Sequence, residues 1–179
     1  MKLLLTSSGI TNKSIENALL ELLGKSFNKS HITFVPTAAN VEGGDKTWLV
    51  DDMNNFRKLN FSSFDIIDIS AVPKNIWLSS FEKADVMVFG GGNVYHLLKW
   101  IKKSDLVDKL PELLKTKVYV GISAGSMVTA KNFSLSRSNI LYYEKNRGLE
   151  NTKGLGYVDF EVRPHLNSKW SPKVRIPFL

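Results

Sequence analysis

The sequence predicts an α/β fold with a three-layer, doubly wound and mostly parallel sheet of the flavodoxin-like kind. The first observation is a series of short apolar runs at residues 2–7, 31–38, 64–70, 85–93 and 117–123. Such short buried runs are typical of parallel strands that are covered on both faces. The second observation is that stretches of helical periodicity separate these runs up to about residue 130. This alternation favours helices on both sides of one sheet.

The helices follow the apolar runs in order. Residues 11–24 place Ile15 and Leu19 on one helical face, and Gly24 offers a stop. Further helices are predicted at residues 45–59, 75–84 and 94–115. The last stretch is expected to form two helices, with the break near Ser104 or before Pro111.

The pattern changes after about residue 132. Residues 132–144 and 156–165 are predicted to form antiparallel or edge strands, joined by a polar segment at 144–156. No repeat, linker or low-complexity tract divides the chain. We therefore expect one domain over residues 1–179, which could lack the last C-terminal elements of its fold.

The composition excludes several kinds of site and location. The chain has no cysteine, which excludes disulfides, thiolate metal sites and a cysteine nucleophile. No apolar run approaches the roughly 18 residues that a membrane span needs, and the start "MKLLLTSSG" is too short for a signal peptide. We expect a cytoplasmic protein without a membrane partner.

The charge is basic, with 24 Lys and Arg against 17 Asp and Glu and a net charge of +7. The lysines are scattered, and the densest cluster, at residues 99–109, interleaves acids at helical spacing. This pattern favours a solvated basic surface, with attraction of small acidic substrates as the second interpretation. Nucleic-acid binding is the least favoured one, because no recognised nucleic-acid motif is present.

The main candidate for chemistry is Ser123, which lies in "VGISAGS" between Gly121 and Gly125. Gly-x-Ser-x-Gly after an apolar strand and before a helix is the nucleophile-elbow pattern, in which a strained turn exposes the serine hydroxyl. The helix that starts near Ala124 directs its N–H groups at the site, where they can stabilise an oxyanion. The alternative is a tightly packed strand–helix crossing without chemistry.

A run of three glycines in "FGGGN", residues 89–93, ends the preceding apolar run. If its strand neighbours the serine strand, the amide of Gly91 or Gly92 can complete an oxyanion hole. A phosphate or dinucleotide loop is the rival interpretation, but neither glycine pattern is satisfied. A flexible turn is the third.

A serine nucleophile needs a base, and the chain has three histidines. His31 opens an early strand, where packing is the expected role. His96 lies one turn into a helix, on the pocket wall or the helix surface. His165 follows a late strand on a loop that Pro164 makes rigid, so we predict that His165 is the base.

The segments "VFGGGNVYHLL", "VYVGISAGSMV" and "DFEVRPHLNS", in this order, resemble peptidase family S51, the dipeptidase E group. The early "LLLTSSG" and "ITFVPTAAN" fit the family too. The resemblance implies the class I glutamine amidotransferase-like fold and a serine peptidase without metal or cofactor. Its substrates would be dipeptides or short peptides with an N-terminal aspartate. It implies Ser123 as nucleophile, His165 as base, and Gly91 or Gly92 with Ala124 as the oxyanion hole.

The sequence departs from the family at the third member of the triad. The family carries a carboxylate about fifteen to twenty residues after the serine, but no acid occurs here before Glu144. We take Glu144 as the candidate acid, with Glu150 and Asp159 behind it. Ser138 or Asn139 could orient the histidine instead.

Binding of an aspartate side chain calls for a cation. Arg163 and Arg175 flank the histidine loop and are the candidates, since arginine binds carboxylates bidentately. Asn93, at the end of the glycine run, is a further substrate-binding candidate. The only partner expected is a small peptide, and a homodimer stays open.

Two alternative functions remain open. One is a catalytically silent relative that binds a small molecule and keeps the serine turn. The other is a hydrolase of β-aspartyl bonds, similar to cyanophycinase, which shares that turn.

Overall fold

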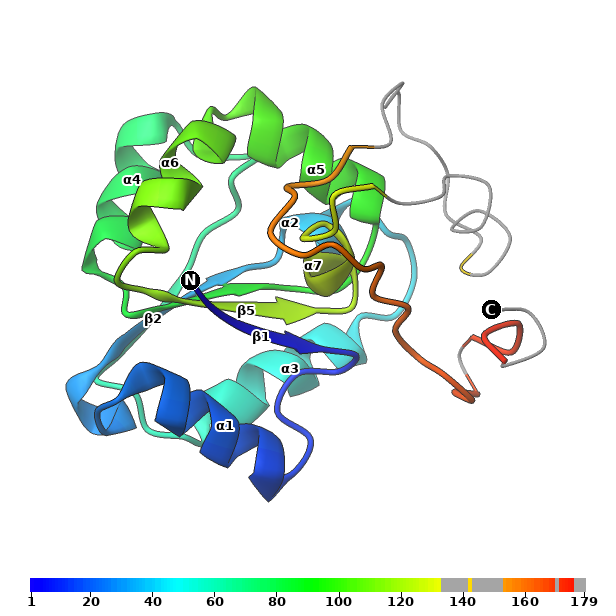
Figure 1. Cartoon of the computed structure of the whole chain (residues 1–179), viewed down its shortest axis with the longest axis horizontal. Coiled ribbons are helices and arrows are strands. Elements are labelled where there is room, and N and C mark those ends of the chain that lie inside the picture. Colours follow the sequence, from blue (N-terminus) through cyan, green and yellow to red (C-terminus); the bar gives the residue numbers. More distant parts are fainter. Residues whose placement is uncertain (133–141, 143–152, 170, 176–179) are drawn as a thin grey trace.

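A computed structural model describes residues 1–132, 142, 153–169 and 171–175 of the chain. The described residues contain a five-stranded sheet in the order β1-β5-β4-β2-β3, and every pairing in it is parallel (Figure 1). The strands are β1 (Lys2–Thr6), β2 (His31–Val35), β3 (Ser63–Ile66), β4 (Val86–Phe89) and β5 (Val118–Ile122).

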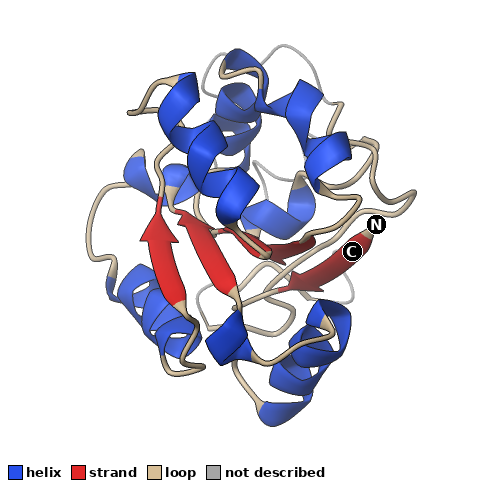
Figure 2. Cartoon of the chain, turned by 90° about the vertical axis from the view of Figure 1, so that its left-hand side faces the viewer, coloured by secondary structure: helices blue, strands red, loops and turns tan. Residues whose placement is uncertain are grey.

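Helices cover both faces of this sheet (Figures 1 and 2). They are α1 (Lys13–Leu23), α2 (Thr37–Asn40), α3 (Thr47–Arg57), α4 (Lys74–Lys83), α5 (Val94–Lys103), α6 (Leu106–Leu113) and α7 (Ala124–Met127), with a short 3₁₀ turn at Phe27–Lys29. Helices α1 and α3 lie on one face, and α4, α5, α6 and α7 lie on the other (Figure 1). Among the described residues, no helix is long and apolar enough to cross a membrane.

The central strands β4 and β5 bury their side chains on both faces, as the continuous apolar runs predict. Val86 and Val88 belong to the core under α1 and α3, whereas Met87 and Phe89 belong to the core under α4, α5 and α6. Burying one such aliphatic or aromatic side chain stabilises the fold by about 1.5–3 kcal/mol. The two cores therefore hold the sheet between two helical layers.

The predicted α/β fold class is confirmed, with all five strands at the expected positions. The predicted helix pair at 94–115 breaks at Ser104 and Asp105, and Asp105 has a left-handed backbone with φ of 62°. Pro111 lies inside α6 and does not end it. Strands β4 and β5 are direct neighbours, with Phe89 opposite Gly121, so the glycine run and the serine turn end side by side.

The prediction of a strand at 156–165 is wrong. This segment forms no strand, and its single bridge pairs Val158 with Ala130. Its backbone is bonded instead to the turn after α7, with Leu155 N–H donating to Val128 O at 2.8 Å and Tyr157 N–H donating to Thr129 O at 2.8 Å. A turn cannot provide the regular row of backbone donors and acceptors that pairs with a strand. The alternating apolar residues of this segment therefore do not indicate an edge strand. Most of the other predicted strand, 132–144, lies outside the described residues.

Candidate active site

Ser123 lies at the carboxyl end of β5 with φ of 48° and ψ of −106°, a conformation that residues other than glycine rarely adopt. The crossing around it leaves no room for side chains. A Cβ atom on Gly125 would lie 1.9 Å from Phe89 O, and one on Gly121 would lie 2.7 Å from Gly125 O. The two glycines are therefore required by contact with backbone, and the strain at Ser123 is held by its surroundings.

A buried polar network ties this turn to the end of β1. Thr6 O accepts hydrogen bonds from Ser123 N–H at 3.0 Å and from Ser126 Oγ at 2.8 Å. Ser126 Oγ in turn accepts from Thr6 N–H at 3.0 Å, and Thr6 Oγ1 donates to Gly121 O at 2.9 Å. Thr6 and Ser126 are both buried, so these bonds are shielded from water. The network fixes the first turn of α7 and, with it, the direction of Ser123.

His165 lies beside Ser123, with 2.8 Å between Ser123 Oγ and His165 Nε2. The His165 backbone is left-handed, with φ of 67°, and its N–H donates to Ser7 Oγ at 3.3 Å. Burial lowers the pKa of His165 below its ordinary value of 6.5, because the charged imidazolium loses solvation. The ring is thus neutral near pH 7, and a neutral imidazole can accept the serine proton.

The loop that carries His165 is held at several points. Tyr142 Oη donates to Pro164 O at 3.0 Å, Ser168 N–H donates to His165 O at 3.0 Å, and Asn167 N–H donates to Val174 O at 3.0 Å. These bonds flank the histidine on both sides. They fix the loop that presents the imidazole.

The glycine run forms the second wall of the site. A Cβ atom on Gly91 would lie 3.4 Å from Ser123 Cβ, which puts the Gly91 backbone against the serine. Gly92 has φ of 124°, and a Cβ atom there would lie 2.3 Å from Ala38 O of α2. In the described part of the chain, the N–H groups of Gly91, Gly92 and Ala124 donate no hydrogen bond to the protein. Unused backbone amides beside a serine hydroxyl are the kind of donor that an oxyanion needs.

Asn93 and His96 serve the helix that follows the glycines. Asn93 Oδ1 accepts from His96 N–H at 2.9 Å and caps α5, while Asn93 N–H donates to Ala38 O at 2.9 Å. His96 is half-buried, and its ring meets Trp100 edge-on. The Asn93 side chain therefore has a structural role, in addition to its predicted contact with substrate.

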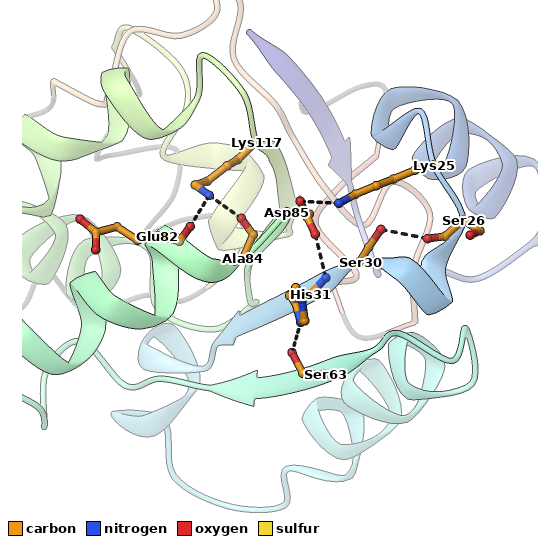
Figure 3. Close-up of polar contacts among 9 residues, drawn as sticks. All are labelled: Lys25, Ser26, Ser30, His31, Ser63, Glu82, Ala84, Asp85 and Lys117. Carbon is orange, nitrogen blue, oxygen red and sulfur yellow. Dashed lines mark hydrogen bonds and ion pairs between the residues drawn. The ribbon is translucent and has the colours of Figure 1, made fainter.

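His31 lies at the opposite end of the sheet from Ser123, because His31 opens β2 whereas Ser123 follows the last residue of β5. Figure 3 shows His31 among the polar contacts at its own end of the sheet. Its Nδ1 lies 2.7 Å from Ser63 Oγ, and its N–H donates to Asp85 Oδ2 at 2.9 Å. Asp85 also pairs with Lys25 at 2.8 Å. This polar cluster joins the amino ends of β2, β3 and β4, which agrees with the packing role expected for His31.

The two arginine candidates both have protein partners. Arg163 pairs with Glu161. Arg175 Nη1 donates to Val174 O at 3.0 Å, and more weakly to Ser168 O at 3.4 Å. A substrate carboxylate would have to share or displace these partners.

The candidate acid Glu144 lies outside the described residues, as do Glu150, Ser138 and Asn139. Asp159 is described and exposed, on the rim of a hollow of about 390 Å³ that Lys131, Tyr157 and Phe160 also line. Within the described part of the chain, no carboxylate is hydrogen-bonded to His165. The third member of the triad thus stays a prediction.

Sequence reasoning missed four residues around the site: Thr6, Ser7, Trp48 and Ser126. Thr6 and Ser7 follow the first apolar run, and carboxyl ends of parallel strands share one edge of a sheet. That rule could have placed them near the serine. Trp48 and Ser126 gave no separate signal, because their roles come from contacts between distant segments.

The fold and the site together define an α/β protein with a serine–histidine pair at the carboxyl edge of a parallel sheet, an arrangement typical of hydrolases. The sequence model of peptidase family S51 matches residues 3–176. The chain belongs to this family.

Curated relatives agree with the assignment to a family of peptidases. An uncharacterized peptidase of Pasteurella multocida is 28% identical over 92% of this chain and 77% of its own length. An uncharacterized peptidase of Listeria monocytogenes is 30% identical over 76% of this chain and 66% of its own length. Peptidase E of Shewanella oneidensis is 34% identical over 52% of this chain and 38% of its own length. The chain thus spans only part of the length of each relative.

Solved structures share the fold. A candidate peptidase E from Listeria monocytogenes superposes with a TM-score of 0.80 at 27% identity, covering 94% of this chain and 81% of that one. A peptidase from an acI-B1 actinobacterium superposes with a TM-score of 0.68 at 20% identity, covering 92% and 68%. The second likeness concerns the fold alone.

Proposed function

We propose that this protein is a serine peptidase that hydrolyses dipeptides or short peptides with an N-terminal aspartate. The observation that carries the proposal is the 2.8 Å contact between Ser123 Oγ and His165 Nε2 on a strained turn. Membership of family S51 and the name peptidase E of several relatives support peptide hydrolysis, and the aspartyl substrate class is what the resemblance to the dipeptidase E group implies. The roles of single residues are part of the proposal.

The reaction would begin with attack of Ser123 Oγ on the scissile carbonyl carbon, while His165 Nε2 accepts the serine proton. The carbonyl π electrons move onto oxygen and form a tetrahedral oxyanion. The C–N bond then breaks, and His165 gives its proton to the departing amine. Water then gives a proton to His165 and attacks the acyl carbon, the ester C–O bond breaks, and His165 returns the proton to Ser123 Oγ as the free acid leaves.

The oxyanion would be held by amides of the glycine run and of α7. Gly91 or Gly92 supplies one N–H group and Ala124 supplies the other, which are the groups that lack a protein acceptor among the described residues. Removing one such donor typically lowers kcat by about 10²–10³. Backbone donors cannot be removed by substitution of a side chain, so this part of the proposal rests on geometry.

The aspartate side chain would be bound by a cation. Arg163 and Arg175, with Asn93, stay the candidates from the sequence, and the net charge of +7 favours the approach of acidic peptides. No metal or cofactor is needed for the steps above. A cytoplasmic location, and a homodimer as an open option, remain predictions from the sequence.

The test is release of free aspartate from a panel of Asp-X dipeptides. We expect turnover by the wild type and loss of about 10³-fold or more in Ser123→Ala and His165→Ala. Two matched controls are Ser62→Ala, an exposed serine, and His31→Ala, at the far end of the sheet; both should keep activity. Full hydrolysis by Ser123→Ala would refute the mechanism.

The same panel, extended by the matching isoaspartyl dipeptides, separates the alternative functions. Isoaspartyl dipeptides turned over in preference to aspartyl ones would indicate a β-aspartyl hydrolase. No turnover of any peptide, together with a Ser123 that a fluorophosphonate does not label, would indicate the catalytically silent relative.

A further inference from the structure

Trp48 lies against the glycine loop and the serine turn. The position that a Cβ atom would take on Gly91 is 3.6 Å from Trp48 Cζ3 and 3.4 Å from Ser123 Cβ. The six-membered ring of the indole, the loop backbone and the serine therefore meet at one point. Trp48 comes from α3, on the opposite side of the sheet from α5 and α7.

The first turn of α3 fixes Trp48 in this place. Asp45 Oδ1 accepts hydrogen bonds from Thr47 N–H at 2.8 Å and from Thr47 Oγ1 at 2.6 Å, which anchors the residue before the tryptophan. Leu49, directly after it, is 7% exposed and packs in the core. With both neighbours held, the backbone of Trp48 is fixed beside the loop.

Trp48 is nevertheless 39% exposed, so part of its ring faces solvent at the edge of the site. Single exposed apolar residues are ordinary in folded proteins. Val50, which is 50% exposed on the same helix, is an example. What distinguishes Trp48 is its place beside Gly91, the residue of the glycine loop that lies against Ser123.

We infer that Trp48 is an aromatic wall of the substrate cleft and determines specificity for an apolar side chain in the residue that follows the aspartate. The inference rests on the proposed function. The face of an indole ring carries partial negative charge, which disfavours contact with a carboxylate, whereas its large apolar surface gains from burial against another apolar group. The aspartate side chain must therefore bind elsewhere, and the neighbouring residue of the peptide is the one that gains from contact with Trp48.

The inference is tested first by the ratio of kcat/KM for Asp-Leu to kcat/KM for Asp-Gly. We expect Trp48→Ala to lower this ratio on the order of tenfold, mainly through KM for Asp-Leu, because only the larger side chain reaches the indole. Trp48→Phe keeps an aromatic wall and should keep most of the ratio. Val50→Ala is the matched control and should leave the ratio unchanged. A Trp48 that only supports the loop would lower both kcat/KM values equally, which would overturn the inference.

A second readout needs no turnover. Ser123→Ala is titrated with Asp-Leu and with Asp-Gly while tryptophan fluorescence is followed, and Ser123→Ala/Trp48→Phe provides the reference. We expect a saturable change that depends on Trp48 and occurs at lower concentrations of Asp-Leu. Saturable binding, measured by calorimetry, without any signal from Trp48 would overturn the inference.

The two proposals fail in different ways. Hydrolysis of Asp-X peptides with the same preference in Trp48→Ala would overturn the role of Trp48 and leave the proposed function intact. If Asp-X peptides are not hydrolysed, labelling of Ser123 by a small alkyl and a bulky aryl fluorophosphonate decides. A ratio of labelling rates that shifts in Trp48→Ala supports the wall and refutes the substrate class. An unchanged ratio, or a Ser123 that neither reagent labels, overturns both.

Discussion

Ser123 Oγ and His165 Nε2 lie 2.8 Å apart although 42 positions separate the two residues in the chain. One residue is held by a strand end and a buried network, the other by an irregular loop. That loop is bonded to the turn after α7, through Leu155 N–H to Val128 O and Tyr157 N–H to Thr129 O. The serine and its partner are thus positioned from the two ends of one short helix, which makes their separation sensitive to the packing of α7.

The pH dependence of activity should report the buried histidine. Burial lowers the pKa of His165 below 6.5, so the neutral ring persists into mildly acidic solution. Only the neutral form accepts a proton, and we therefore expect kcat/KM to stay level as pH falls from 8 and to decline with an inflection below pH 6.5. The measurement is kcat/KM for one Asp-X dipeptide from pH 4.5 to 8.5. An inflection above pH 6.5 would contradict the burial of this histidine.

The network between Thr6 and Ser126 should matter for both stability and activity. Ser126→Ala leaves the N–H of Thr6 without its acceptor in a buried place, and such a loss costs about 1–3 kcal/mol. The turn that carries Ser123 also loses a tie to β1, so kcat should fall. Urea unfolding and dipeptide hydrolysis measure the two effects. Ser62→Ala, on an exposed serine, is the control; equal stability of both variants would show that the network contributes nothing.

Local patterns in the sequence predict the fold and the chemical centre well. Apolar runs locate the strands, Gly-x-Ser-x-Gly locates the strained turn at Ser123, and the small number of histidines leaves His165 as the base. In each case the signal lies within a few neighbouring residues. The glycine run at residues 89–93 is also visible as a local pattern, and the direct pairing of β4 with β5 brings it beside the serine.

Contacts between distant segments could not be predicted in this way. Thr6 meets Ser126 across 120 positions because β1 pairs with β5, and no local pattern announces that strand order. Trp48 and Gly91 likewise come from separate segments, which follow β2 and β4, and the pairing of these two strands is not announced by a local pattern either. At residues 156–165 the local pattern was misleading. Its alternating apolar residues predict a strand, but the segment is an irregular loop whose backbone is bonded to the turn after α7.

Gly125→Ala should disrupt the fold at the serine turn. The new Cβ atom would lie 1.9 Å from Phe89 O, which is backbone of a central strand and cannot move aside cheaply. We expect loss of more than about 3 kcal/mol of stability, or failure to fold, with no hydrolysis. Gly43→Ala is a matched control, because nothing lies within 4 Å of its added methyl group. Melting temperatures of the two variants make the comparison, and a stable Gly125→Ala protein would contradict the close crossing.

Asp52 on α3 should destabilise the protein at neutral pH. Burial, with a smaller contribution from the charge of Asp51, raises the pKa of Asp52 from 3.8 to about 6. Between these two values the folded state binds more protons than the unfolded state, so stability falls as pH rises through about 6.

Asp52→Asn removes the charge and keeps the shape. We expect the variant to gain on the order of 1–3 kcal/mol over the wild type at pH 8, and little at pH 4. Urea unfolding at both pH values measures the gain, with Glu21→Gln, at an exposed position of α1, as the control. If Asp52→Asn were less stable than the wild type at pH 8, the carboxylate would have a favourable partner, and burial would not be the dominant influence on its pKa.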